Sequence, residues 1–85
     1  MPPVTIYTTP YCPYCASAKA LLKGKDIELD EIDVSASAAQ REAMIARAGG
    51  RYTVPQIFIG ERHIGGCDDL HALDAKGELD RLLQS

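Results

Sequence analysis

The amino-acid sequence predicts one domain of the α/β class over residues 1–85, with a four-stranded mixed sheet flanked by helices. The main observation behind this prediction is the order of the segments along the chain, β-α-β-α-β-β-α. Strands separated by a helix are expected to pair in parallel with a right-handed crossover, and the last two strands to form an antiparallel hairpin. The chain of 85 residues is also too short for a second domain.

A β-α-β unit is predicted at the start of the chain. Residues 4–8 are β-branched and aromatic, which is typical of a strand. After Pro13 the apolar residues recur at helical spacing, and Gly24 marks the end of that helix. Residues 27–34 largely alternate between apolar and acidic side chains, and this period of two predicts a half-buried strand.

A second helix and a hairpin are predicted next. Ser37 and Gln40 have the spacing of a capping box at the start of a helix, which the glycines at 49–50 end. Residues 55–59 read as a strand, and residues 62–64 as its partner after a short turn. This hairpin completes the predicted sheet.

One helical element is predicted after the hairpin. Asp68 or Asp69 is the expected N-cap, because a carboxylate accepts hydrogen bonds from free backbone N–H groups. Leucines between residues 70 and 83 form an apolar face that continues past Gly77. We expect this face to pack on the sheet.

Composition and charge exclude several classes of function. The formal net charge is −3 with both signs interspersed, which does not favour nucleic-acid binding. No apolar run is long enough to span a membrane, and no export signal is expected at the start. Three cysteines are few for a small secreted protein, so a reducing cytoplasm is expected, with cysteines that serve chemistry.

The motif Cys12-Pro13-Tyr14-Cys15 lies where the first strand gives way to a helix. Pro13 suits the first helical position, which makes Cys12 the predicted N-cap. Free N–H groups and the helix dipole favour a thiolate there, so Cys12 is the predicted nucleophile. Cys15 lies nearly one turn further and deeper, where burial disfavours its thiolate, and it is the predicted second redox cysteine.

Zinc binding is the main alternative for this spacing of cysteines. Zinc needs four ligands, and Cys67, His63 and His71 are the further candidates. A proline inside the motif at a helix start favours redox chemistry, so no metal site is predicted.

The sequence resembles the dithiol glutaredoxins, a branch of the thioredoxin-like fold, over nearly its whole length. Three motifs carry the resemblance: residues 12–15, Thr53-Val54-Pro55 and the Gly-Gly-Cys-Asp-Asp run at 65–69. It implies a cis bond before Pro55 and a site for glutathione. The residues that it assigns to glutathione are Tyr14, Arg51, Thr53, Val54, Pro55, Gly66, Cys67 and Asp68, with Pro13 and Gly65 in support.

Two positions need separate comment. Many glutaredoxins have Lys where this chain has Thr9, and we expect Arg51 or Arg41 to replace it as the partner of the glycyl carboxylate. At Cys67 the backbone N–H, not the sulfur, is expected to face glutathione, with the thiol itself exposed. The alternative is a third redox centre that exchanges with Cys12.

The resemblance implies a glutathione-dependent reductase of protein disulfides and protein–glutathione mixed disulfides. Glutathione would be a co-substrate, with no tightly bound cofactor, and glutathione reductase would act indirectly by regenerating it. The protein is expected to be a cytoplasmic monomer. Alternatives are a thioredoxin-like electron carrier and an iron–sulfur or zinc-binding module. The carrier would not need the pocket at residues 65–69, and Pro13-Tyr14-Cys15 argues against the cluster.

Overall fold

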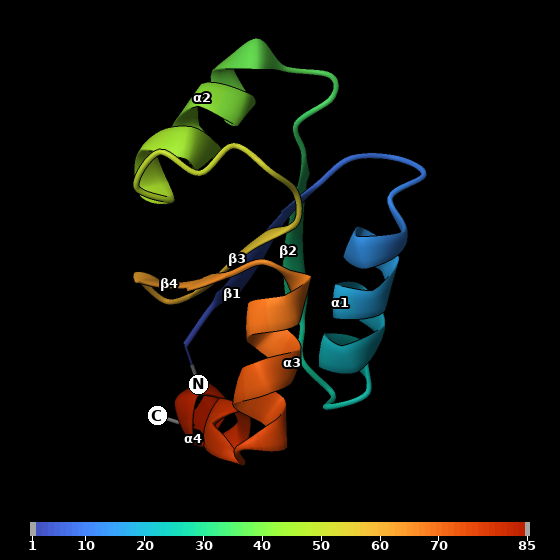
Figure 1. Cartoon of the computed structure of the whole chain (residues 1–85), viewed down its shortest axis with the longest axis vertical. Helices are drawn as coiled ribbons and strands as arrows, with labels where there is room; N and C mark the ends of the chain where they lie inside the picture. The colour runs from blue at the N-terminus through green and yellow to red at the C-terminus, as the bar shows by residue number, and fades with distance from the viewer. Residues whose placement is uncertain (1, 85) are drawn as a thin grey trace.

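The computed structural model describes residues 2–84 and contains a four-stranded mixed sheet with helices on both faces (Figure 1). The predicted fold class is confirmed. The elements, in chain order, are β1 (Val4–Thr8), α1 (Pro13–Lys23), β2 (Leu29–Asp33), α2 (Ala38–Arg47), β3 (Gln56–Ile59), β4 (Arg62–Gly65), α3 (Cys67–Ala75) and α4 (Glu78–Gln84).

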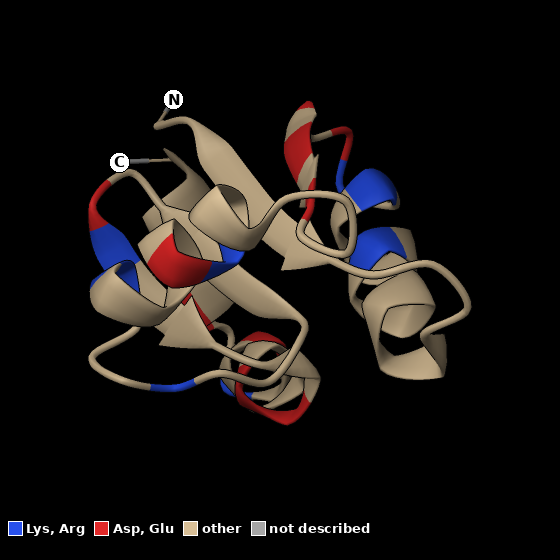
Figure 2. Ribbon diagram, turned by 90° about the horizontal axis from the view of Figure 1, so that it is seen from above, with Lys and Arg blue, Asp and Glu red and all other residues tan. Residues whose placement is uncertain are grey.

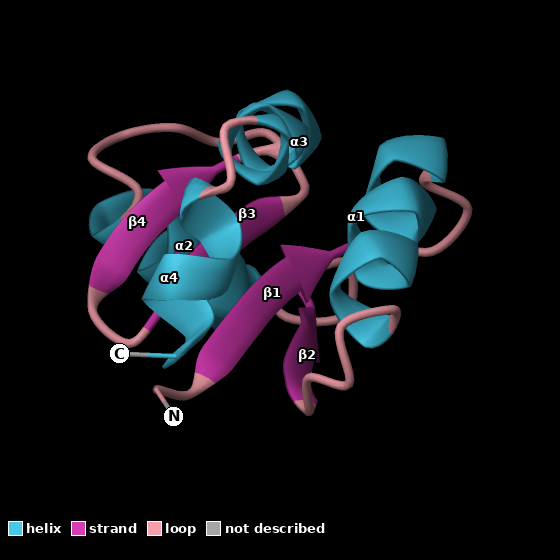
Figure 3. Ribbon diagram, turned by 90° about the horizontal axis from the view of Figure 1, so that it is seen from below, coloured by secondary structure: helices cyan, strands magenta, loops and turns pink. Residues whose placement is uncertain are grey.

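The sheet has the strand order β2-β1-β3-β4 (Figure 3). Strands β1 and β2 pair in parallel, as expected for a β-α-β unit, whereas β3 is antiparallel to both of its neighbours. The register shifts between Ile57 and Phe58, where β3 meets β4. Residues 9–12 connect the carboxyl end of β1 to the start of α1.

The two faces of the sheet carry two separate apolar clusters, because successive strand residues point to opposite sides. Ile6 and Ile57 belong to the larger cluster, which packs against α1, α3 and α4. Tyr7 and Phe58 belong to the smaller cluster, which packs against Met44 of α2. Figure 1 shows α2 on one side of the sheet, opposite α3 and α4.

The region after the hairpin differs from the prediction in two ways. The helical segment is broken into α3 and α4, because Gly77 has a φ of 75°, which no helix residue adopts. The N-cap of α3 is Gly66 rather than Asp68 or Asp69. Asp69 is instead the third residue of α3. Its carboxylate accepts a hydrogen bond from the N–H of Gly66, as in a capping box. No helix within residues 2–84 combines the length and apolar character needed to cross a membrane.

Candidate active site

Cys12 lies at the N-cap of α1, as the position of Pro13 predicts. Its backbone is extended, with φ −102° and ψ 108°, and Pro13 begins the helix. The Cys12 Sγ accepts a hydrogen bond from the backbone N–H of Cys15 over 3.2 Å. The side chain is partly exposed, so a substrate sulfur can approach it. A free N–H and the positive end of a helix dipole both favour negative charge at such a position.

Cys15 differs from Cys12 in burial and in chemistry. It is 1% exposed. Burial raises the pKa of its thiol from 9.0 to about 11, and the contact with Cys12 adds to this effect. Cys15 therefore keeps its proton at neutral pH. The two free thiols are unequal, because the Cys12 side chain is partly exposed and the Cys15 side chain is buried.

A groove of about 420 Å³ runs beside Cys12, between α1 and the end of β2. Thr9 lines it, together with the ion pair of Lys19 and Glu31. Lys19 Nζ and Thr8 Oγ1 both donate to Glu31 Oε2, over 3.0 and 2.8 Å, and these contacts lower the pKa of Glu31. Figure 2 shows the basic residues of α1 beside the acidic strand β2.

A second cleft, of about 330 Å³, has walls from three parts of the chain. They are the start of α1, the segment before β3 and the start of α3. The bond between Val54 and Pro55 is cis, as the resemblance implies. The cleft is lined by Tyr14, Arg51, Thr53, Val54, Pro55, Gly66, Cys67, Asp68 and Asp69. All eight residues predicted for glutathione therefore lie together, although they come from distant parts of the sequence.

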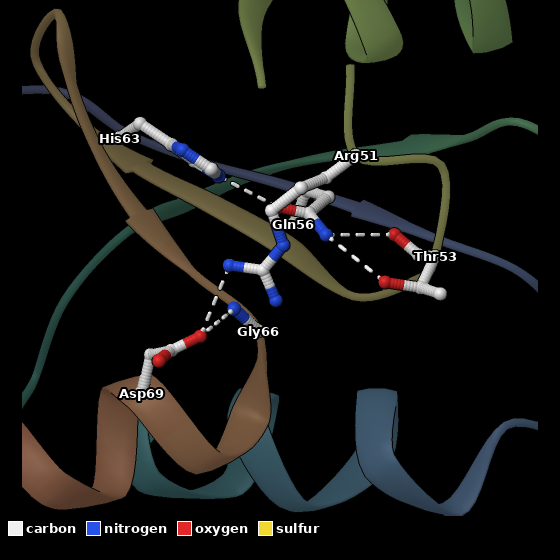
Figure 4. A network of polar contacts seen from close by, with 6 residues as sticks. All are labelled: Arg51, Thr53, Gln56, His63, Gly66 and Asp69. Atoms are coloured by element: carbon white, nitrogen blue, oxygen red, sulfur yellow. Dashed lines mark hydrogen bonds and ion pairs between the residues drawn. The ribbon is translucent and has the colours of Figure 1, made fainter. Parts of the chain in front are cut away.

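The charged side chains of this cleft are already partly paired (Figure 4). Arg51 Nη1 donates to Asp69 Oδ2 over 3.2 Å, and the N–H of Gly66 donates to the same oxygen over 2.9 Å. The hydrogen bond from Gly66 is the main cause that lowers the pKa of Asp69, and Arg51 contributes. The cleft thus has a cation held at one wall and helix N–H groups at another. This arrangement suits a ligand with carboxylates.

Comparison with known proteins identifies the family. The family model "Glutaredoxin" matches residues 4–64. Glutaredoxin 3 of Escherichia coli K12 is 59% identical over 81 residues, which are 95% of this chain and 96% of that protein. The chain belongs to the glutaredoxin family. A glutaredoxin of Pseudomonas aeruginosa is also 55% identical over the full length of both chains.

Solved glutaredoxins have the same fold as this glutaredoxin. The solution structure of the Brucella melitensis protein is 59% identical, with a TM-score of 0.85, and the match covers 98% of this chain and 89% of that one. A crystal structure of a buckwheat glutaredoxin–glutathione complex is 30% identical, with a TM-score of 0.87, over 98% and 77% of the two chains. Glutaredoxins are thiol–disulfide oxidoreductases, and this chain is an enzyme of that class.

Several predicted residues are found in a different setting. Cys67 is buried, with 7% exposure, as the first residue of α3, so the prediction of an exposed thiol was wrong. Cys67 belongs to the larger apolar cluster, together with Leu70 of the same helix and Ile57 of β3. Of the two arginines proposed for the glycyl carboxylate, Arg51 lines the cleft, whereas Arg41 donates to the carbonyl of Tyr52. Pro13 lines the groove beside Cys12.

Three residues at or beside the cleft do not follow from the sequence patterns. Asp69 was considered only as a cap, although its spacing of three from Gly66 is that of a capping box. The sequence presents Gln56 only as a strand residue and His63 as a strand residue and a candidate zinc ligand, and no sequence signal links the two. In residues 2–84, no group of three or more His, Cys, Asp and Glu side chains is arranged to hold a metal ion.

Proposed function

We propose that this glutaredoxin reduces protein disulfides and protein–glutathione mixed disulfides, with glutathione as co-substrate. The observation that supports the proposal is the cleft lined by residues of the segments 51–55 and 66–69 and by Tyr14, which belongs to the reactive motif itself. Its polar groups match a small peptide with two carboxylates and an ammonium group. The buckwheat relative forms a complex with glutathione, and its 30% identity to this chain supports the same ligand here.

In the proposed monothiol route, the Cys12 thiolate attacks the glutathione sulfur of a protein mixed disulfide. A bond forms between Cys12 and glutathione, and the protein sulfur leaves as a thiolate that takes a proton. A second glutathione thiolate then attacks the glutathione on Cys12. This step releases oxidised glutathione and restores the Cys12 thiolate, so only Cys12 is required.

In the proposed dithiol route, Cys12 forms a mixed disulfide with a target protein, and Cys15 attacks the Cys12 sulfur. The target leaves with both sulfurs reduced, and two glutathione molecules then reduce the Cys12–Cys15 bond. The high pKa of Cys15 comes first from burial and second from its contact with Cys12. Because a mixed disulfide removes the negative charge on Cys12, attack by Cys15 becomes easier after the first step.

We assign the cleft residues to glutathione as follows. The γ-glutamyl carboxylate lies at the start of α3, near the backbone N–H groups of Cys67 and Asp68. The ammonium group pairs with the Asp68 carboxylate, and the glycyl carboxylate with Arg51. The main chain of Val54 pairs with that of glutathione, and Tyr14 lines the sulfur. We place the reaction in a reducing cytoplasm, with a monomeric enzyme and with glutathione reductase regenerating the co-substrate.

A coupled assay tests the proposal. The purified protein is mixed with glutathione, glutathione reductase, NADPH and a glutathionylated protein, and NADPH consumption is followed. We expect turnover that depends on both the protein and glutathione. No turnover here, with turnover when thioredoxin reductase replaces glutathione and its reductase, would contradict the proposal and support a thioredoxin-like carrier.

A further inference from the structure

Gln56, the first residue of β3, is a polar side chain that is completely buried beside the cleft. Its Nε2 donates to the carbonyl oxygen of Thr53 over 3.0 Å and to Thr53 Oγ1 over 3.2 Å. Its Oε1 lies 2.6 Å from His63 Nε2. Figure 4 shows these three residues in a row from β4 to the segment before β3. A buried amide whose nitrogen and oxygen both have hydrogen-bond partners is held rigidly and can support its neighbours.

The direction of each hydrogen bond in this row is fixed by chemistry. The carbonyl of Thr53 only accepts, so the amide NH₂ of Gln56 must face it. Oε1 of Gln56 then faces His63, whose Nε2 must carry the proton that it donates. The ring of His63 stacks on Phe58, with centroids 4.9 Å apart, which holds the imidazole in place. His63 therefore orients Gln56, and Gln56 orients Thr53.

The orientation of Thr53 determines where the next peptide N–H points. In a planar trans peptide the N–H of one residue is opposite to the preceding C=O. Because the Thr53 carbonyl is held toward Gln56, the N–H of Val54 is directed away from Gln56. Val54 lines the cleft, and this N–H is the donor that an extended peptide ligand needs there.

We propose that Gln56 and His63 are positioning residues that fix the Thr53–Val54 peptide for pairing with the glutathione main chain. The inference rests on the proposed function and adds two residues that do not line the cleft. Neither residue takes part in the exchange of sulfurs. Losing either should therefore weaken recognition of the glutathione moiety and leave the reactivity of Cys12 toward small reagents unchanged.

The first test compares Gln56→Glu and Gln56→Met with the unaltered protein. Both variants keep the size of the side chain and remove the N–H donors to Thr53. We expect KM for a glutathionylated peptide to rise about five- to tenfold, as the loss of one or two hydrogen bonds implies, with kcat within about twofold. The rate at which iodoacetamide alkylates Cys12 should stay within about twofold.

A second pair of variants separates positioning from folding. His63→Phe keeps a ring on Phe58 and removes the donor to Gln56, whereas His63→Gln restores an N–H donor at a similar reach. We expect a raised KM for His63→Phe and a value near the original for His63→Gln. Leu83→Ala, in α4 on the larger apolar cluster, is the control for lost stability and should leave KM unchanged.

The outcomes distinguish this inference from the function on which it rests. If the unaltered protein reduces a disulfide with a chemical reductant but shows no glutathione-dependent turnover, the proposed function fails. If it turns over and folded Gln56 and His63 variants have unchanged KM, the positioning inference is wrong. It is also wrong if His63→Phe and His63→Gln are equally impaired. A raised KM in Gln56→Met and His63→Phe, absent in Leu83→Ala, supports it.

Discussion

Arg51 Nη1 lies 3.2 Å from Asp69 Oδ2, and that same oxygen accepts the N–H of Gly66 over 2.9 Å. Asp69 thus stabilises the first turn of α3 by accepting the N–H of its N-cap residue, and it also holds Arg51 at the wall of the cleft. Both side chains are about half exposed, at 48% and 49%, so water weakens the ion pair. The backbone contact is therefore expected to matter more for stability than the pair with Arg51.

Asp69→Ala should lower the free energy of unfolding by about 1 kcal/mol, because the N–H of Gly66 loses its acceptor. Urea denaturation measures this change. Asp68→Ala is the matched control, since Asp68 is an exposed carboxylate one residue earlier in the same turn. Equal losses of stability in the two variants would contradict the role that we give to Asp69.

Asp68→Ala should instead weaken the use of glutathione, because we pair Asp68 with the ammonium group. The side chain is exposed, so the contact is worth up to about 1 kcal/mol, or a rise in KM for glutathione of about fivefold. Steady-state kinetics with glutathione as the varied substrate measures it. Unchanged kinetics in the folded variant would mean that Asp68 has no part in binding.

Cys12→Ser should abolish turnover in every assay, because Cys12 has the accessible sulfur. Cys15→Ser should still remove glutathione from proteins and should lose much of its reduction of protein disulfides. The paired assays are deglutathionylation of a peptide and reduction of insulin. Complete loss of both activities in both variants would contradict the different roles of the two cysteines.

How far the sequence predicts this molecule depends on how local each interaction is. The N-cap position of Cys12 follows from Pro13, its neighbour, and the structure agrees. The end of α3 depends on Gly77, whose φ of 75° could not be read from an apolar pattern that continues on both sides. Local signals thus predicted the start of α1 but not the break between α3 and α4.

The cleft shows the same difference. Seven of its eight predicted residues, all but Arg51, belong to the family motifs, and motifs carry long-range information that periodicity lacks. The burial of Cys67 was missed because a helix start is usually exposed, and here it is packed against the sheet. The contact of Gln56 with His63 spans a strand register shift, which no pattern in a single sequence encodes.

Cys67→Ser should retain most activity, because the proposed role of Cys67 uses its backbone N–H. Placing a hydroxyl in the apolar cluster should cost about 1 kcal/mol of unfolding free energy. Mass mapping after oxidation should find the Cys12–Cys15 bond. A dominant Cys12–Cys67 bond would show instead that Cys67 is a third redox centre, and an inactive folded variant would contradict a role limited to the backbone N–H.

The last prediction concerns pH and the Cys15 thiol. Its pKa in the folded protein is about 11, raised from 9.0 mainly by burial. The folded state therefore holds this proton more tightly than the unfolded chain does. The resulting stability is fully present below the unfolded value and is lost as pH rises from 9.0 through about 11.

Two pKa units correspond to about 2–3 kcal/mol, which is the largest loss that Cys15 can cause. Lysines and tyrosines also titrate in this range, so the measurement must be a difference between two proteins. Cys15→Ser is the matched variant, because it lacks the thiol and keeps the other groups. Urea denaturation under reducing conditions at about pH 8 and about pH 10.5 should show stability falling more steeply in the unaltered protein than in Cys15→Ser. Parallel curves for the two proteins would mean that burial does not hold the proton on Cys15.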